Sequence, residues 1–289
     1  MKINKSFRFS NFNGVHQTSW ALGVAVTCMF MPYVEAATTT VNLGTAGSFA
    51  ILAGSAITDA GNASSIIDGD VGLYPTTGAA IGLTPSQVVG GTIYSAETSG
   101  ALLNQAQNDL TSAYVDAAGR PFTQDFGVVD NQLGGKTLFP GVYRFGGAAT
   151  ANLIGNLTLD ANGEVDPVWI FQATSTLITA SDASVTLIGA NSCDVFWQVG
   201  SSATIGTGTD FVGNIMADQS IALQTNATLE GSALARIAAV TLDHNTITTL
   251  DCGSGTAVPE TSSSLALLGS AFSALLAFHG RGKRNRDKQ

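Results

Sequence analysis

The sequence predicts a mainly β solenoid with one long α-helix packed alongside it. Three observations support this class. The 289 residues include 33 glycines and only 11% charged residues, and residues 43–75 contain short alternating strand patterns between turns. Further along, two apolar phrases recur at short intervals, which is typical of stacked coils. A single segment carries apolar residues at helical spacing instead.

The repeat is clearest in the second half of the chain. Aligning its phrases gives an apolar column at intervals of 28, 18 and 19, namely Leu177, Ile205, Leu223 and Leu242. Two positions later a polar column follows, with Thr179, Thr207, Thr225 and His244. A third column, directly before the first, holds Thr176, Thr204, Ala222 and Thr241. Because strand side chains alternate, we expect the apolar column to point inward and the threonines to form rows on one face. The longer first interval predicts an inserted loop near 188–192.

The helix is predicted over 95–118. Its apolar residues recur at intervals of 4, 4, 3 and 4, as Leu102, Ala106, Leu110, Ala113 and Ala117. Gly119 and Pro121 end the pattern. We expect this helix to lie on a flat surface through its small residues.

Both ends of the chain look like targeting segments. Residues 1–36 combine basic residues, an apolar run over 21–31 and small residues at the −3 and −1 positions of a cleavage site near Ala36, which predicts a secretory signal peptide. The apolar run is short for a membrane anchor, the alternative interpretation. Residues 258–289 contain Val258-Pro259-Glu260-Thr261, a Ser/Ala/Leu-rich stretch over 262–278 and a basic end. This tail resembles the PEP-CTERM sorting signals of Gram-negative bacteria, which implies processing by an exosortase-like enzyme, although Thr261 replaces a second proline. A plain membrane helix with cytoplasmic Lys/Arg is the alternative. Either interpretation predicts a secreted protein or one at the cell surface, with a mature domain over 37–257.

The charge and the cysteine content limit the classes of function that the chain can have. Residues 37–257 hold four basic and eighteen acidic residues, a formal charge of −14, which excludes nucleic acid as a partner. Cys193 and Cys252 form an even pair in an exported domain, so we expect a disulfide between them. His244 is the domain's single histidine and no CxxC spacing occurs, so we expect neither a metal site nor a cofactor.

The threonine rows suggest a surface that orders water. Threonine is stiff at χ1 and suits strands, so one exposed threonine is ordinary strand chemistry. Aligned rows in a region almost without basic residues indicate instead that one face is kept uncharged. Hydroxyl and methyl groups repeating at about 4.7–4.9 Å could hold water in a fixed array.

The phrases themselves resemble a known family. "LGTAGSFAILAGSAIT" from Leu43, "IIDGDVGLYP" from Ile66, "LFPGVYRF" from Leu138 and "DVFWQVGSSATIGTGTDFVGNIMA" from Asp194 are similar to the β-solenoid ice-binding (antifreeze) proteins of bacteria and fungi. The resemblance covers about residues 41–252. It implies a right-handed, discontinuous β-helix of triangular section, an ice crystal as the partner and no enzymatic activity.

Members of that family carry a Thr-Ala/Gly-x-Thr/Asn pattern on one flat face. In this chain Asp182, Asp210, Asn226 and His244 depart from the pattern, and we expect modest antifreeze strength because carboxylates hold their own hydration. The residues expected to contact ice are Thr176, Thr179, Ser181, Thr204, Thr207, Thr209, Thr225, Thr228, Thr241 and Thr246.

Two other functions stay open from the sequence. A polysaccharide-active β-helix enzyme would need clustered carboxylates, which Asp68 with Asp70, and Asp160 with Glu164 and Asp166, could supply. No Lys or Arg lies beside either cluster, so both are interpreted as turn acids. The sorting tail suggests the other alternative, a structural or adhesive protein that binds extracellular matrix or the outer membrane.

Overall fold

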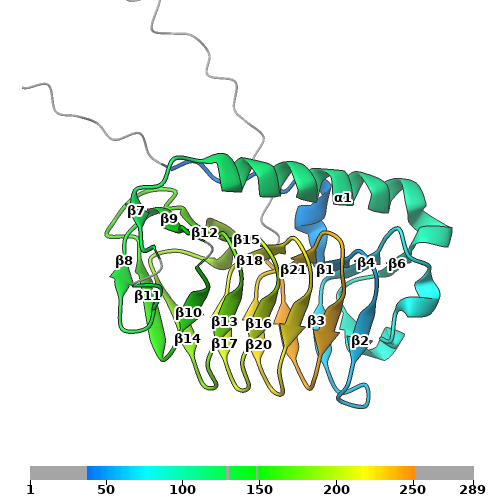
Figure 1. The fold of residues 1–289 in the computed structure, drawn as a ribbon. Coiled ribbons are helices and arrows are strands. Elements are labelled where there is room, and N and C mark those ends of the chain that lie inside the picture. Colours follow the sequence, from blue (N-terminus) through cyan, green and yellow to red (C-terminus); the bar gives the residue numbers. More distant parts are fainter. Residues whose placement is uncertain (1–37, 128–129, 148, 251–289) are drawn as a thin grey trace, which may run out of the picture. The chain divides into compact units, whose positions relative to one another are not determined.

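The computed structural model describes residues 38–127, 130–147 and 149–250, which form a coil of short parallel strands with one helix alongside (Figure 1). The predicted signal peptide, 1–36, and the predicted sorting tail, 258–289, lie outside the described residues. Within the described part, no helix has the length and apolar character needed to cross a membrane.

Three parallel sheets make up the coil, and each turn of the chain passes through sheet B, then sheet C, then sheet A. In spatial order, the described strands of sheet A are β6 (Ile93–Ser95), β4 (Asp70–Leu73), β1 (Phe49–Ala53), β21 (Ala233–Ala235), β18 (Asn214–Ala217), β15 (Val195–Val199), β12 (Trp169–Ala173), β9 (Gly141–Phe145) and β7 (Gln124–Asp125). Those of sheet B are β10 (Ala151–Leu153), β13 (Leu177–Thr179), β16 (Ala203–Ile205), β19 (Ile221–Leu223), β22 (Val240–Leu242) and β2 (Ile57–Asp59). Those of sheet C are β5 (Val88–Val89), β3 (Ile66–Asp68), β23 (Thr246–Thr248), β20 (Thr228–Glu230), β17 (Asp210–Val212), β14 (Ser184–Ile188), β11 (Asn156–Asp160) and β8 (Thr137–Leu138).

The order of the coils is discontinuous in sequence. The first coils stack on the last one, because β1 pairs with β21, β2 with β22 and β3 with β23. Helix α1 (Ala96–Gly119) then carries the chain from β6 at one edge of sheet A to β7 at the other (Figure 1). A kink at Ser99 divides the helix, and the part after it, residues 100–119, spans about 30 Å at ~1.5 Å per residue. Nine strands at ~4.8 Å spacing span about 38 Å, so the straight part of the helix crosses most of the sheet.

The predicted helix is confirmed, with both ends shifted by one residue. Its buried stripe differs at one position, because Leu103 is buried while Leu102 is 40% exposed. The stripe therefore runs at intervals of 3, 4, 3 and 4, and it packs on the outer side of sheet A against Ile170, Phe196, Met216 and Leu234. Three alanines in the stripe let the helix approach the sheet closely, as the sequence predicted.

The middle of sheet A is buried on both sides, between α1 and the interior of the coil, whereas its edge strands β6 and β7 are partly or fully exposed. The strands β1, β12 and β15 are buried at every residue, which explains their continuous apolar sequences. Gly44–Ser48, inside the region predicted as strands, forms the 3-10 helix η1 instead. The other short 3-10 helices are η2 (Gly78–Ala80), η3 (Pro85–Gln87) and η4 (Ser192–Asp194).

The coils differ in the number of residues per turn, and the wide coils, which contain more residues, hold different side chains in their interior from the others. In sequence numbering, successive sheet B strands begin at intervals of 26 from β10 to β16, then at intervals of 18 and 19 up to β22. The wide coils hold stacked rings, with Phe171 and Trp197 at 4.0 Å between centroids and Tyr143 at 5.5 Å from Phe171. In the coil that starts at β13, the extra residues lie between β14 and β15, around η4, so the insertion predicted near 188–192 is confirmed.

Candidate functional site

The register of sheet B corrects the alignment predicted from sequence. Leu177 pairs with Ala203 rather than with Ile205, so the first interval of the inward column is 26 and the predicted 28 is wrong. The alignment matched large aliphatic residues, whereas the coil accepts a buried alanine at the inward position 203. In this register Thr179 lies beside Ile205, in an inward column of sheet B. The sequence alignment had placed it beside Thr207, two residues further on.

Two predicted surface threonines are therefore inside the coil. Thr179 is 4% exposed and Thr209 is fully buried, and their hydroxyl oxygens lie 3.1 Å apart. The hydroxyl of Thr179 also accepts a hydrogen bond from the backbone N–H of Gly206 at 2.7 Å. The expectation that these two side chains face outward is wrong, because they satisfy buried polar groups at a turn.

The outward side of sheet B carries two uncharged rows. The central row occupies the middle residue of each strand: Asn152, Ile178, Thr204, Ala222, Thr241 and Thr58. The upstream row lies two residues earlier: Thr150, Thr176, Ser202, Ser220, Ala239 and Ala56. Neighbouring strands lie about 4.7–4.9 Å apart and the two rows about 6.6–6.8 Å apart. Small hydroxyl and methyl groups thus form a regular array in two directions.

Most hydroxyl groups of this array are free to bind water. Within the described residues, four of the seven hydroxyls, those of Thr58, Thr204, Ser220 and Thr241, make no hydrogen bond to the protein. The Ser202 hydroxyl accepts a hydrogen bond from the Ser220 N–H at 3.3 Å. Thr150 and Thr176 are paired with each other at 2.8 Å. Because threonine is β-branched, its hydroxyl and methyl groups are held in few rotamers.

Charge begins at the corner between sheets B and C. Backbone hydrogen bonds align Ser181, Thr207, Thr225 and Asp243 along this corner. The Thr225 hydroxyl donates to Asp243, and His244 Nδ1 lies 2.7 Å from the same carboxylate; these contacts lower the pKa of Asp243 from its ordinary value. Asp243 is therefore ionised at neutral pH.

His244 was predicted in the place that Asp243 occupies, and that prediction is wrong. Thr246 follows Leu242 by four positions, whereas Thr228 follows Leu223 by five, so the last turn is one residue shorter. The next corner position has a left-handed backbone in all four coils, with φ of 57°, 65°, 59° and 56° at Asp182, Gly208, Asn226 and His244. Gly, Asn, Asp and His tolerate this conformation best. Three departures from the family pattern therefore serve the turn.

Sheet C presents a different outward face. One row holds Asn156, Ser184, Asp210, Thr228, Thr246 and Ile66. The other holds Thr158, Thr186, Val212, Glu230, Thr248 and Asp68. Acidic side chains interrupt both rows. Asp210, one of the residues that depart from the family pattern, lies in the first of these rows and therefore outside the array on sheet B.

The ten predicted ice-contacting residues consequently do not share one face. Sheet B holds three of them, Thr176, Thr204 and Thr241. The corner holds Ser181, Thr207 and Thr225; sheet C holds Thr228 and Thr246; the interior holds Thr179 and Thr209. Sequence reasoning missed Thr58, Thr150, Ser202 and Ser220. A register that allowed alanine at position 203 would have found the two serines, whereas Thr58 joins the face only because the first coils stack on the last.

The opposite edge of the array, at the corner between sheets A and B, carries one cation. Arg236 Nη1 lies 2.5 Å from Asp218 Oδ1, and its guanidinium stacks 4.5 Å from the centroid of the Tyr114 ring on α1. The Asp218 carboxylate thus neutralises Arg236 beside sheet B, and the Tyr114 ring lies against its guanidinium.

Two of the acids that the sequence suggested as catalytic accept hydrogen bonds from backbone N–H groups. Asp70 accepts a hydrogen bond from the N–H of Thr92 at 2.9 Å, and Asp160 accepts one from Asn162 at 2.8 Å. Within the described part of the chain, no three His, Cys, Asp or Glu side chains are grouped as a metal site would need.

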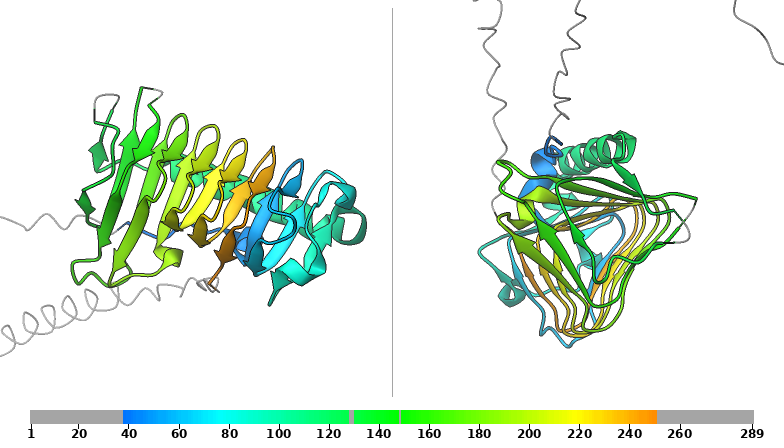
Figure 2. Two further views of the ribbon diagram at one scale, coloured as in Figure 1. Left: turned by 90° about the horizontal axis from the view of Figure 1, so that it is seen from below. Right: turned by 90° about the vertical axis from the view of Figure 1, so that its left-hand side faces the viewer.

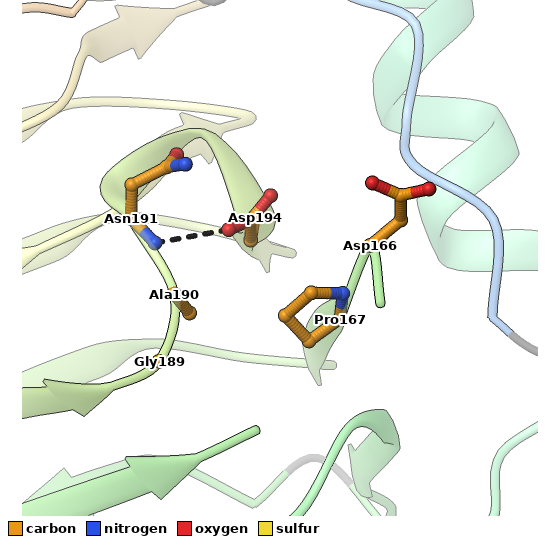
Figure 3. Close-up of a pocket in the computed structure, with 6 residues that line it drawn as sticks. All are labelled: Asp166, Pro167, Gly189, Ala190, Asn191 and Asp194. Atoms are coloured by element: carbon orange, nitrogen blue, oxygen red, sulfur yellow. Dashed lines mark hydrogen bonds between the residues drawn. The ribbon is translucent and has the colours of Figure 1, made fainter. Parts of the chain in front are cut away.

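A shallow hollow lies between the turns of the two wide coils, and Figure 3 shows the residues that line it: Asp166, Pro167, Gly189, Ala190, Asn191 and Asp194. Asp194 accepts a hydrogen bond from the Asn191 N–H at 2.9 Å. Burial, and secondarily the charge of Asp166, raise the pKa of Asp194. None of the six described residues that line the hollow is basic.

Cys193 lies in η4 and takes part in a disulfide. Cys252 is outside the described residues, so its pairing with Cys193 stays a prediction.

The architecture and this face define a class: β-solenoids with one helix against one sheet and an uncharged array of small side chains on another. The chain belongs to the ice-binding-like family, because a family model described as Ice-binding-like matches residues 51–248. It is 42% identical over 248 residues to the ice-binding protein of Nostoc sp. (strain HG1), covering 84% of this chain and 88% of that protein. Identity to the ice-binding protein of Flavobacterium frigoris (strain PS1) is 39% over 217 residues, covering 72% and 76%.

A solved structure shows the same fold. The ice-binding protein from the Antarctic ascomycete Antarctomyces psychrotrophicus matches with a TM-score of 0.65 and 38% identity, over 73% of this chain and 98% of that one. Its architecture agrees with the mainly β prediction from sequence.

Proposed function

We propose that this chain binds ice through the outward face of sheet B and thereby slows ice growth or recrystallisation. The observation that carries the proposal is the uncharged two-row array on that sheet, bordered by ionised Asp243 on one side and by the neutralised Arg236 on the other. The names of the relatives, all ice-binding proteins, support the same partner.

The array suits ice for a physical reason. Hydroxyls that no protein group occupies can hydrogen-bond to water at fixed spacings, while methyl groups lie against the ordered water between them. Little side-chain entropy is lost on binding, because strands and β-branched residues are already rigid. The contacting residues with unoccupied hydroxyls are Thr58, Thr204, Thr207, Ser220 and Thr241. Thr176, Ser202 and Thr225 lie among them and contribute with hydroxyls that are already bonded to Thr150, the Ser220 N–H and Asp243.

We further infer a right-handed coil of triangular section, as the sequence resemblance implies. Right-handed connections between parallel strands are the strong general rule. The chain is not an enzyme, in keeping with its relatives. It is exported through residues 1–36 and held at the surface of a Gram-negative cell, or processed by an exosortase-like enzyme, through residues 258–289.

The test is recrystallisation inhibition by the purified protein. Wild type is expected to inhibit ice recrystallisation, and Thr204→Tyr is expected to lose most of this activity because the larger ring lifts ice off both rows. Circular dichroism of the variant must match wild type. Equal inhibition by the two folded proteins would rule out this face.

A further inference from the structure

Each border of the array on sheet B carries an acid in contact with a side chain that can be positively charged. At the corner between sheets A and B, Asp218 lies 2.5 Å from Arg236, whose guanidinium is always protonated. At the corner between sheets B and C, Asp243 follows Thr241 of the central row by two positions, and its Oδ1 lies 2.7 Å from His244 Nδ1. The first pair is neutral at every ordinary pH, whereas the second is neutral only when the imidazole is protonated.

The turn itself does not require a histidine at position 244. The three preceding coils place Asp182, Gly208 and Asn226 at the corresponding position, each with the same left-handed backbone as His244. Aspartate, glycine and asparagine suit this conformation. Of the four residue types, histidine is the one that ordinarily changes its charge between about pH 5 and pH 8. His244 therefore brings a property to the corner that the turn does not need.

The ring of His244 packs against the neighbouring coil. Because the first coil stacks on the last, the loop that follows β2 lies beside this turn (Figure 2). A Cβ atom added to Gly61 in that loop would lie 2.7 Å from His244 Nδ1, so only a glycine leaves room for the ring. This contact restricts the ring to a position in which Nδ1 meets the Asp243 carboxylate.

Asp243 supplies the charge that touches the ring, and the adjacent elements add none in contact with it. The turn of the preceding coil presents Thr225 and Asn226, which are uncharged. The loop after β2 carries Asp59, but its carboxylate accepts hydrogen bonds from the Gly61 N–H at 3.0 Å and from the hydroxyl of Ser65 at 3.0 Å. The carboxylate of Asp59 is thus bound within its own loop.

The charge of this corner changes in one step between acidic and alkaline solution. The hydrogen bonds from Thr225 and His244 hold the pKa of Asp243 below its ordinary value, so its carboxylate stays ionised while an imidazole titrates. With a neutral imidazole the pair carries one negative charge. With a protonated imidazole it carries none, and both borders of the array then hold a neutral ion pair.

We propose that His244 makes ice binding depend on pH, because the protonated imidazole neutralises Asp243 and strengthens adsorption whereas the neutral imidazole leaves it weaker. The inference rests on the proposed function of sheet B. Ice that grows onto this face must displace liquid water from the corner as well as from the two rows. Removing water from a neutral ion pair costs less than removing it from a carboxylate without a counter-charge, since the attraction within the pair offsets part of the cost.

The experiment compares purified full-length wild type with His244→Asn and Asp243→Asn at about pH 5 and about pH 8. Asparagine tolerates the backbone at position 244, as Asn226 shows in the preceding coil. The readout is the protein concentration that halves the rate of ice recrystallisation, and circular dichroism must agree between the three proteins at both pH values. The other two histidines, His16 and His279, are present in all three proteins, so His244→Asn isolates the contribution of position 244.

Wild type is expected to be about threefold more active at the lower pH, because only there is the corner neutral. His244→Asn should differ by less than about 1.5-fold between the two pH values, at the activity that wild type has at the higher pH. Asp243→Asn should reverse the dependence and be about threefold less active at the lower pH, because its imidazolium has no counter-charge. An equal pH dependence in wild type and His244→Asn, or no reversal in Asp243→Asn, would overturn the inference. Wild type that is inactive at both pH values would instead refute the ice-binding function itself.

Discussion

Sheets B and C are built from the same coils, and both present rows of hydroxylated side chains, yet only sheet B leaves them uncharged and largely unpaired. On sheet C, Asn156 Oδ1 accepts hydrogen bonds from Ser184 and Thr186, each at 2.9 Å. Thr228 donates to Asp210 at 2.8 Å. These hydroxyls are satisfied by neighbouring coils, and carboxylates stand among them.

The difference shows that threonine content alone does not identify the binding surface. A carboxylate orders water around itself, and a hydroxyl bonded to a neighbouring side chain has less capacity left for water. What sets sheet B apart is the absence of charge from both outward rows together with free hydroxyls on Thr58, Thr204 and Thr241.

The largest difference between the two sheets is expected when one carboxylate is added to the outward face of each in separate variants. Thr204→Asp places the charge in the central row of sheet B, and Val212→Asp places it on sheet C of the same coil. Recrystallisation inhibition should fall about tenfold or more in the first variant, a loss of ~1.4 kcal/mol or more, and by less than about twofold in the second. Similar losses in both would show that charge anywhere on the coil weakens adsorption.

Valine substitutions separate buried from exposed threonines. Thr179→Val leaves the buried Gly206 N–H without its acceptor and should lower the free energy of unfolding by about 1–3 kcal/mol. Thr207→Val, at the exposed corner, should change it by less than about 0.5 kcal/mol. Denaturant unfolding measures both. If the two variants were equally stable, the inward register of Thr179 would be wrong.

The smallest effect is expected on Tm when Asp194, which lines the hollow between sheets C and A, is substituted. The raised pKa of Asp194 means that the folded state binds its proton more tightly than the unfolded state. Stability therefore falls as pH rises from the ordinary carboxyl value through the raised one. Asp194→Asn, which keeps an acceptor for the Asn191 N–H, should raise Tm at pH 7 by about 2 °C or less and leave it unchanged near pH 3. A lower Tm at pH 7 would contradict this role.

Much of the fold could be predicted because its signals are local. The apolar stripe from Ala106 to Ala117 predicted the helix, and the recurring apolar phrases predicted the coils. The choice between Leu102 and Leu103 was not decided by spacing, since both fit a helical stripe. The apolar phrases of sheet A, such as the one at Trp169, also could not show that α1 covers their outer side.

The candidate face was harder to predict because it depends on register. A shift of two residues at Leu177 keeps the alternation intact, yet it moves Thr179 from the surface to the interior. A turn shortened by one residue replaced His244 by Asp243 in the corner row. Thr58 lies more than 180 positions before Thr241, its partner on the neighbouring strand, so only the stacking of the first coils on the last brings them together.

One coil offers a matched pair for the decisive measurement. Thr241 on β22 and Thr248 on β23 are both half-buried outward threonines, and neither hydroxyl bonds to another described residue. The measurement is the amount of fluorescently labelled protein that a growing ice crystal takes up, for Thr241→Tyr against Thr248→Tyr. We predict that Thr241→Tyr loses about tenfold and that Thr248→Tyr stays within about twofold of wild type. Uptake lost by Thr248→Tyr and kept by Thr241→Tyr would place the ice-binding face on sheet C and contradict the assignment to sheet B.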